Sequence, residues 1–287
     1  SVVIIGGGVI GVEWASMLTD FDVEVTILEL GDRLLPTEDV AISEEMLKQL
    51  TKRGVRVHFN IELDPAAIEV TNQVTIPLKD TTIEAQALLL SVGRVANTEN
   101  IGIENTEIEL EKGVVLVNEC FQTKESHIYA IGDVIGGMQL AHVASHEGIQ
   151  AVEHIAGELS IPMHYANIAR GVYSHPEVAS VGLTEAQARS HGYQVKTATF
   201  PFKAIGKAMV YGEPEGFIKV IADELTNDVV GVHLIGPHAT DLISEAALGI
   251  FLNASPWEVG QMVHLHPSLS EIMGEAALAI EGKAIHF

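Results

Sequence analysis

The sequence predicts an α/β protein in three parts, and three observations carry that prediction. An apolar strand at residues 2–5 runs into a glycine-rich turn and a helix. Strand and helix patterns then alternate as far as residue 95, which is typical of a parallel sheet with helices on its faces. After residue 166, longer strands alternate with helices in the manner of an antiparallel α+β domain. The expected domains are 1–95, 96–165 and 166–287.

Length and composition fit a folded chain with more than one compact unit. The chain has 287 residues, and a single hydrophobic core rarely grows past roughly 250. Hydrophobic residues make up 47% and charged residues 19%, a balance that favours a globular protein over a disordered one. The formal net charge of -23 opposes binding to nucleic acid or to an anionic membrane surface, so we expect neither.

Cysteine usage and apolar runs bear on the compartment. Cys120 is the only cysteine, which excludes a disulfide within the chain and a metal site built from several cysteines. We expect Cys120 to be a small buried side chain, and we expect no metal. Because no run of about 20 apolar residues occurs, no membrane span is expected, and a cytoplasmic setting is the simpler interpretation. A motif that begins at residue 1 without an initiator Met favours a piece of a longer protein.

The first residues carry a glycine motif in a specific setting. Gly6, Gly8 and Gly11 have the spacing G-x-G-x-x-G. The predicted elements around them are a strand at 2–5, a helix at 9–20 and a second strand at 23–28. Within a strand-helix-strand unit of about 30 residues, this spacing is the fingerprint of a Rossmann-like dinucleotide-binding domain.

Each glycine of the turn has its own expected task. Gly6 permits the tight turn, Gly8 lets the backbone approach a pyrophosphate, and Gly11 lets the helix pack close to the strand. The amides at the start of the helix then face the pyrophosphate. The candidate cofactor contacts in this turn are Gly6, Gly7, Gly8, Val9, Ile10 and Gly11.

Acidic residues near the turn select the nucleotide. Glu29 follows Gly11 by 18 residues, at the end of the second strand. A carboxylate there can accept hydrogen bonds from the adenosine ribose and repel the 2'-phosphate of NADP, so the sequence predicts NAD. Alternatively, Glu29 is a solvated acid at a strand end. Glu13, expected in the first helical turn, is either a cofactor contact or a complement to the helix dipole. Leu63 is a further candidate cofactor contact.

The rest of the first domain follows the same alternation. The expected elements are a helix at 38–53, a strand at 55–59, a polar hairpin near 74–77 and a strand at 87–92. The last strand runs into Gly93, which would deliver bare backbone to the sheet edge where a nicotinamide lies. Alternatively, Gly93 is only a turn between a strand and a loop.

The middle segment carries a second candidate ligand site. A short apolar strand within 126–131 breaks at Gly132, so that the carboxylate of Asp133 projects from a strand end. A helical stretch runs from Gln139 to about residue 157, and its amide-rich start could meet a second ligand. Alternatively, Asp133 is a helix cap.

The third part is predicted to be an antiparallel sheet with helices on one face. The expected strands are 171–181, 195–200, 217–221 and 229–235, and the expected helices are 184–191, 240–253 and 270–281. No nucleotide fingerprint occurs in this part.

A His-Pro segment precedes the last expected helix. Ser268 and Glu271 have the spacing of a capping box, which would make His266 only part of a turn. An imidazole has an ordinary pKa of about 6.5, so it also suits proton exchange near neutral pH. A carboxylate partner would fix its tautomer. The two roles are compatible, because Glu271 can serve both. His264 is expected to be structural.

Several motifs in one order resemble the pyridine nucleotide-disulfide oxidoreductase family. They are Gly6 to Glu13, Glu29, Val92-Gly93-Arg94, Tyr129 to Asp133, and Gln139 to His142. The resemblance covers essentially the whole chain. It implies that Asp133 closes on the ribityl chain of FAD and that Gln139, Leu140, Ala141 and His142 lie against the flavin.

Within the family, the chain resembles the branch that oxidises dihydrolipoyl groups. This resemblance implies that His266 is the general acid/base toward the dithiol and that Glu271 orients its imidazole. It also implies NAD and FAD as cofactors and a homodimer formed through the third domain, 166–287. The implied partners are lipoyl domains of 2-oxo acid dehydrogenase complexes.

The resemblance also implies features that the chain lacks. The first flavin G-x-G-x-x-G and a C-x-x-x-x-C redox pair would lie upstream of Ser1, and Cys120 alone cannot exchange thiols. We therefore expect the isolated chain to be inactive, to keep NAD binding and to have an incomplete FAD site.

Other enzymes of the family, and proteins without catalytic activity, are alternative interpretations of the sequence. A mercuric reductase would carry a C-terminal cysteine pair, and a glutathione reductase would have basic residues in place of Glu29. A flavoprotein pyridine nucleotide transhydrogenase and a non-catalytic NAD-binding module are the remaining alternatives. A redox cysteine pair upstream would favour the dithiol-oxidising enzyme over both.

Overall fold

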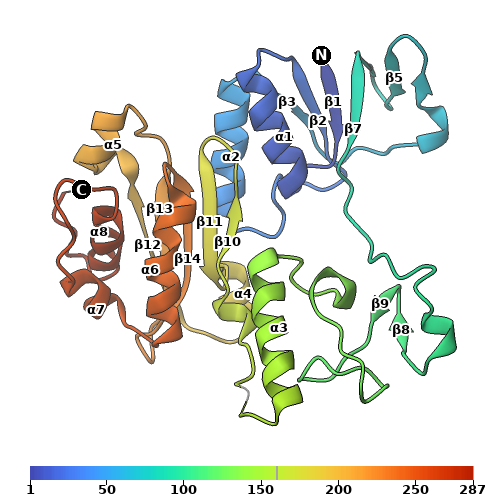
Figure 1. The fold of residues 1–287 in the computed structure, drawn as a ribbon. Helices are drawn as coiled ribbons and strands as arrows, with labels where there is room; N and C mark the ends of the chain where they lie inside the picture. Colours follow the sequence, from blue (N-terminus) through green and yellow to red (C-terminus); the bar gives the residue numbers. More distant parts are fainter. Residues whose placement is uncertain (160, 287) are drawn as a thin grey trace. The chain divides into compact units, whose positions relative to one another are not determined.

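The structure, a computed structural model shown in Figure 1, describes residues 1–159 and 161–286. The chain divides into two compact units. One joins Ser1–Val92 to the part of the chain from Ala169 onward, and the other is Gly93–Ile168. No helix among the described residues is long and apolar enough to cross a membrane. The finer division at 95/96 and 165/166 stays a prediction.

A four-stranded parallel sheet opens the first unit, in the order β3-β2-β1-β7 (Figure 1). Its strands and the two helices between them are β1 (Val2–Ile5), α1 (Val9–Asp20), β2 (Val25–Leu28), α2 (Val40–Lys52), β3 (Arg56–His58) and β7 (Ala87–Leu90). Ile4 and Ile27 are fully buried among apolar residues of both helices. Because β1 and β2 run parallel, their carboxyl ends meet at one edge, where Gly6 and Glu29 follow.

A small antiparallel sheet is inserted between β3 and β7. It follows the 3-10 turn η1 (Pro65–Ala67) and consists of β4 (Glu69–Val70), β5 (Val74–Pro77) and β6 (Thr82–Ala85). The region near 74–77, expected to be a hairpin, is β5, which pairs antiparallel with β4 before it and β6 after it, so the hairpin is confirmed. Val74 and Ile76 are buried in the same cluster as Val3 and Ile5 of β1, which explains why this polar stretch holds a regular strand.

The second unit contains one long helix and short elements. These are η2 (Ile103–Asn105), β8 (Leu110–Glu111), β9 (Val114–Val115), η3 (Gly132–Ile135), α3 (Ala141–Ala156) and η4 (Tyr165–Asn167). The strand expected within 126–131 is reduced to a single bridge between Gln122 and Tyr129. It stays short because Gly132, with φ 73°, turns the backbone into η3. Cys120 is half-buried rather than buried.

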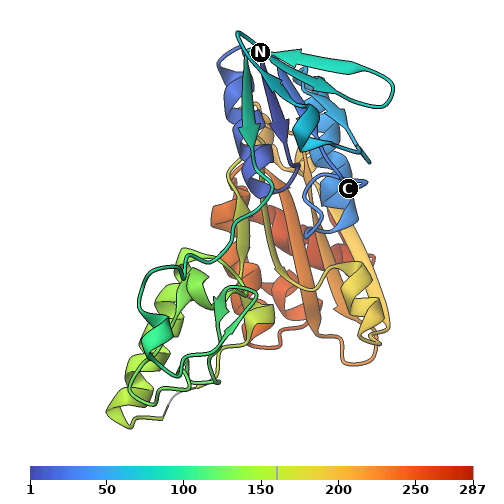
Figure 2. The same ribbon diagram turned by 90° about the vertical axis from the view of Figure 1, so that its right-hand side faces the viewer.

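A five-stranded antiparallel sheet, here called the C-terminal sheet, completes the first unit in the order β10-β11-β14-β13-β12 (Figures 1 and 2). Its strands are β10 (Arg170–Val172), β11 (Glu177–Gly182), β12 (Val195–Pro201), β13 (Phe217–Asp223) and β14 (Val229–Gly236). The single strand expected at 171–181 is two paired strands, β10 and β11. The chain turns between them at Pro176, which has no amide hydrogen for a strand ladder.

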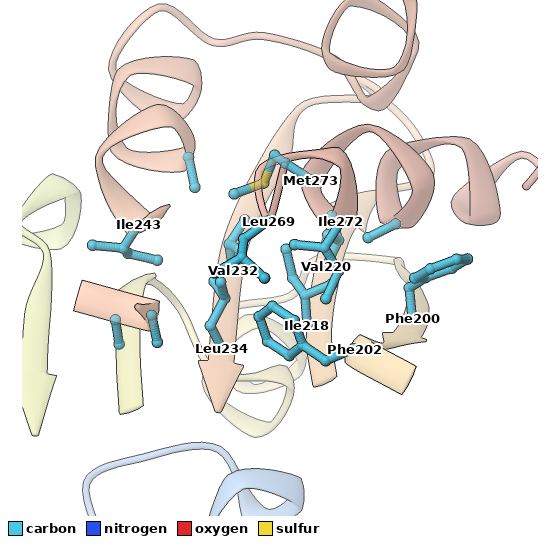
Figure 3. Packing of buried hydrophobic residues seen from close by; sticks show 14 of the residues in the cluster. Phe200, Phe202, Ile218, Val220, Val232, Leu234, Ile243, Leu269, Ile272 and Met273 are labelled. Atoms are coloured by element: carbon cyan, nitrogen blue, oxygen red, sulfur yellow. The ribbon is translucent and has the colours of Figure 1, made fainter. Parts of the chain in front are cut away.

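One face of the C-terminal sheet packs on α6 (Ala239–Phe251) and α8 (Glu271–Ile280). Figure 3 shows the cluster that this packing buries, which includes Phe200, Phe202, Ile218, Val220, Val232, Leu234, Ile243, Leu269, Ile272 and Met273. The strand residues in it alternate along β13 and β14, as the period of two requires. Apolar burial of this kind, at roughly 25 cal/mol per Å², stabilises the domain.

The opposite face is covered too, which corrects the expectation of helices on one face only. Val178 of β11 and Ile235 of β14 share a cluster with Ile42 and Met46 of α2. On the same face, Ala188 of α4 (Glu185–Ser190) is buried with residues of β12 and β13. The expectation failed because this face also carries polar residues, which in a sequence resemble a solvent-exposed face.

Three short helical elements in the part of the chain from Arg170 to residue 286 were not expected. They are η5 (Phe202–Ala204), α5 (Gly206–Tyr211) and α7 (Pro256–Gln261). A signal for α7 is present in the sequence, because Ser255 and Glu258 form a complete capping box and Pro256 stands at the first helical position.

Truncation of a core residue tests the packing in Figure 3. Leu234 is fully buried, so Leu234→Ala should lower the free energy of unfolding by about 2–5 kcal/mol through lost contacts and a residual cavity. Leu225 lies in the turn after β13, is 73% exposed and offers the matched control. Leu225→Ala should change the free energy of unfolding by less than about 0.5 kcal/mol. Urea unfolding of both variants measures the difference, and equal losses would contradict the described core.

Candidate functional site

The glycine turn is held by close backbone contacts. Gly6 has φ 108°, a conformation that favours glycine, and a Cβ there would overlap the carbonyl oxygen of Ser91. A Cβ at Gly11 would overlap the carbonyl oxygen of Gly6, so α1 reaches the turn only because Gly11 has none. The turn therefore places the first turn of α1 against the end of β1.

Ser91 is a residue of this site that the sequence reasoning missed. Its hydroxyl lies 3.0 Å from the carbonyl oxygens of both Ile5 and Gly6, to which it donates. The hydroxyl ties the glycine turn to the end of β7. The signal available in the sequence was weak, namely a polar residue directly after a strongly apolar strand.

Space for a ligand lies at Gly8. This residue precedes α1 as its N-cap, offers no side chain to cap the first amides, and has open space where a Cβ would stand. Val9 and Ile10, the first two residues of α1, are both partly exposed. Amides at a helix N-terminus beside such space suit a diphosphate.

Glu29 lies directly beside the glycine turn. Its Oε2 accepts a hydrogen bond from the Gly7 amide at 2.5 Å, and its Oε1 accepts one from the Gly31 amide at 2.6 Å. Each carboxylate oxygen has a second lone pair, so ribose hydroxyls can still bind. These two bonds hold the carboxylate at the end of β2, beside the glycine turn.

Glu13 is not in the first turn of α1, which corrects that expectation. It is the fifth residue of a helix that begins at Val9, and the first turn contains no acidic residue. Its Oε1 accepts a hydrogen bond from the amide of Tyr173 at 2.8 Å. The side chain therefore ties α1 to the segment after β10, a contact that a sequence pattern could not indicate.

Two further candidates are placed less specifically. Leu63 is half-buried and packs against the cluster that contains Ile5 and Leu28, the last residues of β1 and β2. Gly93, with φ 109°, is the first residue of the second unit and has open space where a Cβ would stand. Its positive φ shows why glycine is suited to this junction.

In the second unit, two of the sequence motifs meet. The Asp133 carboxylate lies 3.1 Å from the Arg94 guanidinium, and both side chains are about half exposed. Asp133 is in η3 rather than at a strand end, directly after Gly132. The neighbouring helix α3 begins after Leu140, which gives no side-chain cap. Gln139 and Leu140 are half-buried there, while Ala141 and His142 are exposed.

Buried polar contacts that the sequence did not predict hold this turn. Glu147 of α3 is 2% exposed, and its Oε2 accepts a hydrogen bond from the Gly132 amide at 2.6 Å. Its other oxygen accepts one from the Tyr165 hydroxyl at 2.9 Å. Burial, together with this bond to the carboxylate, raises the pKa of Tyr165 to about 12. Glu147 thus fixes η3 relative to α3.

His266 and Glu271 are in direct contact. The His266 Nδ1 lies 2.7 Å from Glu271 Oε1, and Glu271 Oε2 accepts a hydrogen bond from the Ser268 amide at 2.9 Å. Because an ionised carboxylate only accepts, Nδ1 carries the hydrogen and Nε2 is left as a proton acceptor. The His266 side chain is 77% exposed, so this acceptor is open to a substrate.

The expected capping box is only half formed. Glu271 bonds the Ser268 amide, but the Ser268 hydroxyl pairs with the Ser270 hydroxyl instead of a helix amide. The helix begins two residues later than a box at Ser268 requires, with Ser270 as an N-cap whose side chain caps no helix amide. Glu271 is therefore occupied mainly with His266 and the loop.

Two other histidines pair with glutamates in the same domain. His264 Nε2 lies 2.9 Å from Glu245, its side chain is 7% exposed, and the bond to Glu245 raises its pKa. A Cβ at Gly274 would press on the His264 ring, so this histidine packs closely on α8. His286 Nδ1 lies 2.7 Å from Glu275. The structural role expected of His264 agrees with this burial.

Comparison with known proteins places these features in a family. The family model described as pyridine nucleotide-disulphide oxidoreductase matches residues 1–148. The model for the dimerisation domain of the same family matches residues 168–277, which include the C-terminal sheet.

Curated relatives and solved structures agree with the family models. The chain is 56% identical to a dihydrolipoyl dehydrogenase of Bacillus subtilis and 39% identical to one of Chlamydia pneumoniae, covering 62% and 61% of their lengths. Among solved structures, the chain is similar to LpdA from Mycobacterium tuberculosis, with 29% identity and a TM-score of 0.89. The match covers 97% of this chain and 61% of that chain. It is also similar to the HOCl-induced flavoprotein disulfide reductase RclA from Escherichia coli (30% identity, TM-score 0.90, 96% of this chain and 64% of that chain). The chain thus spans less than two thirds of each of these proteins.

The Glu271 contacts predict a dependence of stability on pH. Burial acts to raise the pKa of Glu271, but the bonds from Ser268 and His266 outweigh it and hold that pKa below its ordinary value of 4.5. A depressed carboxyl pKa adds stability that is present above pH 4.5 and is lost as pH falls through the folded-state pKa. The advantage of wild type over Glu271→Gln in urea unfolding should therefore shrink between pH 5 and pH 3, measured at about one-unit steps. A difference that stays constant over this window would contradict the assignment.

Proposed function

The chain belongs to the pyridine nucleotide-disulphide oxidoreductase family, and from that premise we propose that it forms the NAD-binding and dimerisation parts of a dihydrolipoyl dehydrogenase. The complete enzyme would oxidise protein-bound dihydrolipoyl groups through a redox disulfide and FAD and reduce NAD+. The 56% identity to the Bacillus subtilis dihydrolipoyl dehydrogenase supports the substrate class. This chain contains one cysteine, so the redox disulfide of this proposal is not formed within it.

The observation that carries the proposal is the solvent-exposed His266 with its Nδ1 held by Glu271. A thiol of the substrate must lose its proton before it can attack a disulfide. The free Nε2 of His266 would accept that proton, and the Glu271 carboxylate would stabilise the imidazolium that results. In general, a nearby carboxylate favours the charged form of an imidazole over the neutral form.

The edge after β1 and β2 fits NAD. Gly8 gives the space, the first amides of α1 would hold the pyrophosphate, and the Glu29 carboxylate would bind the adenosine ribose. The same carboxylate beside the Gly7 amide leaves a 2'-phosphate facing a negative charge, which selects against NADP.

The second unit fits part of an FAD site. The residues proposed to hold the flavin are Asp133, Gln139, Leu140, Ala141 and His142, at η3 and the uncapped start of α3. The flavin, when bound, supplies the relay of two electrons between dithiol and nicotinamide. Glu147 would keep the Gly132 turn in place for it.

The remaining assignments follow from the family and are proposals for the whole protein. The dimerisation domain supports a homodimer in which His266 serves the active site of the other subunit. Lipoyl domains of 2-oxo acid dehydrogenase complexes are the proposed partners, and the cytoplasm is the proposed compartment.

Charge reversal at Glu29 tests the nucleotide assignment. Wild type should be stabilised against heat by NAD and far less by NADP, and Glu29→Arg should reverse or abolish that preference because the ribose acceptor becomes a phosphate ligand. Glu24→Arg makes the same charge change at the exposed opposite end of β2 and should leave the preference intact. Equal thermal shifts of wild type with both nucleotides would refute NAD selectivity.

Removal of the imidazole tests the catalytic assignment in the full-length protein. His266→Gln should slow dihydrolipoamide-dependent NAD+ reduction by about 10²–10⁴-fold, the usual worth of a general acid/base. His286→Gln is the control, since His286 has the same 2.7 Å contact to a glutamate and is also exposed. NADH absorbance reports both rates. A fully active His266→Gln enzyme, or an equal loss in the control, would argue against the assignment.

A further inference from the structure

A row of polar residues is buried on the face of the C-terminal sheet that covers α2. Ser180 of β11 and Lys219 of β13 each stand opposite His233 of β14 in the strand register. Ser180 and His233 are fully buried, and Lys219 is 9% exposed. Burial lowers the pKa of His233, whose Nε2 lies 3.0 Å from the Leu183 carbonyl oxygen.

The ends of this row bind two acidic residues at the start of α2. Lys219 Nζ lies 2.9 Å from Oδ1 of Asp39, the residue that caps α2, and 2.8 Å from Glu185. At the other end, the Ser180 hydroxyl donates to Glu38 at 2.5 Å. Arg170 donates to the same hydroxyl at 3.0 Å and to Glu38 at 3.4 Å. Glu38 and Asp39 are 4% and 3% exposed, so both carboxylates depend on these partners.

A chain of backbone hydrogen bonds leads from Glu38 to the proposed NAD site. The Glu38 amide donates to the Leu35 carbonyl at 2.9 Å, and the Leu35 amide donates to the Gly7 carbonyl at 2.9 Å. Gly7 in turn donates to Glu29. Leu35 is fully buried and has φ 48°, a conformation that a leucine keeps only when its surroundings fix it.

We propose that Lys219, Ser180 and Arg170 are positioning residues for nucleotide binding, through which the dimerisation domain sets the geometry of the glycine turn. They hold Glu38 and Asp39, and these two fix the segment 31–39 that supports Gly7 and Glu29. This inference rests on the NAD site proposed above. It adds that the affinity for NAD depends on a sheet that contributes no atom to that site.

The test compares two lysines of the same sheet in the full-length protein. Lys219→Met keeps most of the side-chain length but leaves Asp39 buried without its cation. Lys196→Met is the matched control, because Lys196 on β12 pairs with Asn227 and Glu281 instead of the segment 31–39. Lys219→Arg is the conservative variant, which restores a cation.

Two readouts separate this inference from the proposed function. Calorimetric titration with NAD should give a dissociation constant raised roughly 2- to 30-fold in Lys219→Met, unchanged in Lys196→Met and largely restored in Lys219→Arg. Hydrogen exchange without nucleotide should show faster deuterium uptake across 31–39 in Lys219→Met alone.

The outcomes are distinct. If wild type does not bind NAD, the proposed function fails, and the exchange measurement alone then decides whether the sheet controls the segment 31–39. If wild type binds NAD and Lys219→Met matches it in affinity and in exchange, the inference is overturned while the proposed function stands. If both lysine variants lose affinity equally, the effect is general destabilisation and the inference is likewise overturned.

Discussion

The edge of the parallel sheet where NAD is proposed to bind depends on one steric constraint, the contact between α1 and the turn that precedes it. Gly11 lacks a Cβ, and any Cβ there would overlap the Gly6 carbonyl oxygen. The helix N-terminus can therefore stand directly at the carboxyl end of β1, where its amides serve an anion. Ser91 completes the constraint from β7 by donating to Ile5 and Gly6. The apolar strands place this edge, and the missing Cβ gives it its shape.

The sequence predicted what local patterns encode. The expected strand at 2–5 and helix at 9–20 coincide with β1 and α1, because glycine spacing and apolar runs act within a few residues. The family assignment is confirmed for the same reason, since its motifs are short segments in a fixed order. His266 and Glu271 lie only five positions apart, within reach of one loop, so their contact could be anticipated.

The sequence could not predict contacts between distant segments. Ser91 is separated from Ile5 by 86 positions, and Lys219 from Asp39 by 180. Neither pair produces a periodic pattern in the sequence. The face of the C-terminal sheet that carries Ser180 and Lys219 is covered by α2, which lies far from both residues in the sequence, so the expected arrangement with helices on one face did not include it. Buried polar pairs imitate a surface in sequence, because the partner that neutralises each one is far away along the chain.

Contact between a histidine and a glutamate does not by itself identify a catalytic group. His264, His266 and His286 all pair with glutamates at 2.7–2.9 Å. In His264 the bonded nitrogen is Nε2 and the ring is buried on α8, so a substrate has no access to it. His286 shares the Nδ1 geometry of His266, and its glutamate also accepts bonds from the backbone amides of Ile285 and His286, so the contact holds this segment against α8. His266 differs from both because it combines an oriented tautomer, an exposed Nε2 and a place in a loop of the dimerisation domain. The role proposed for His266 requires that combination, and the carboxylate contact supplies only its first part.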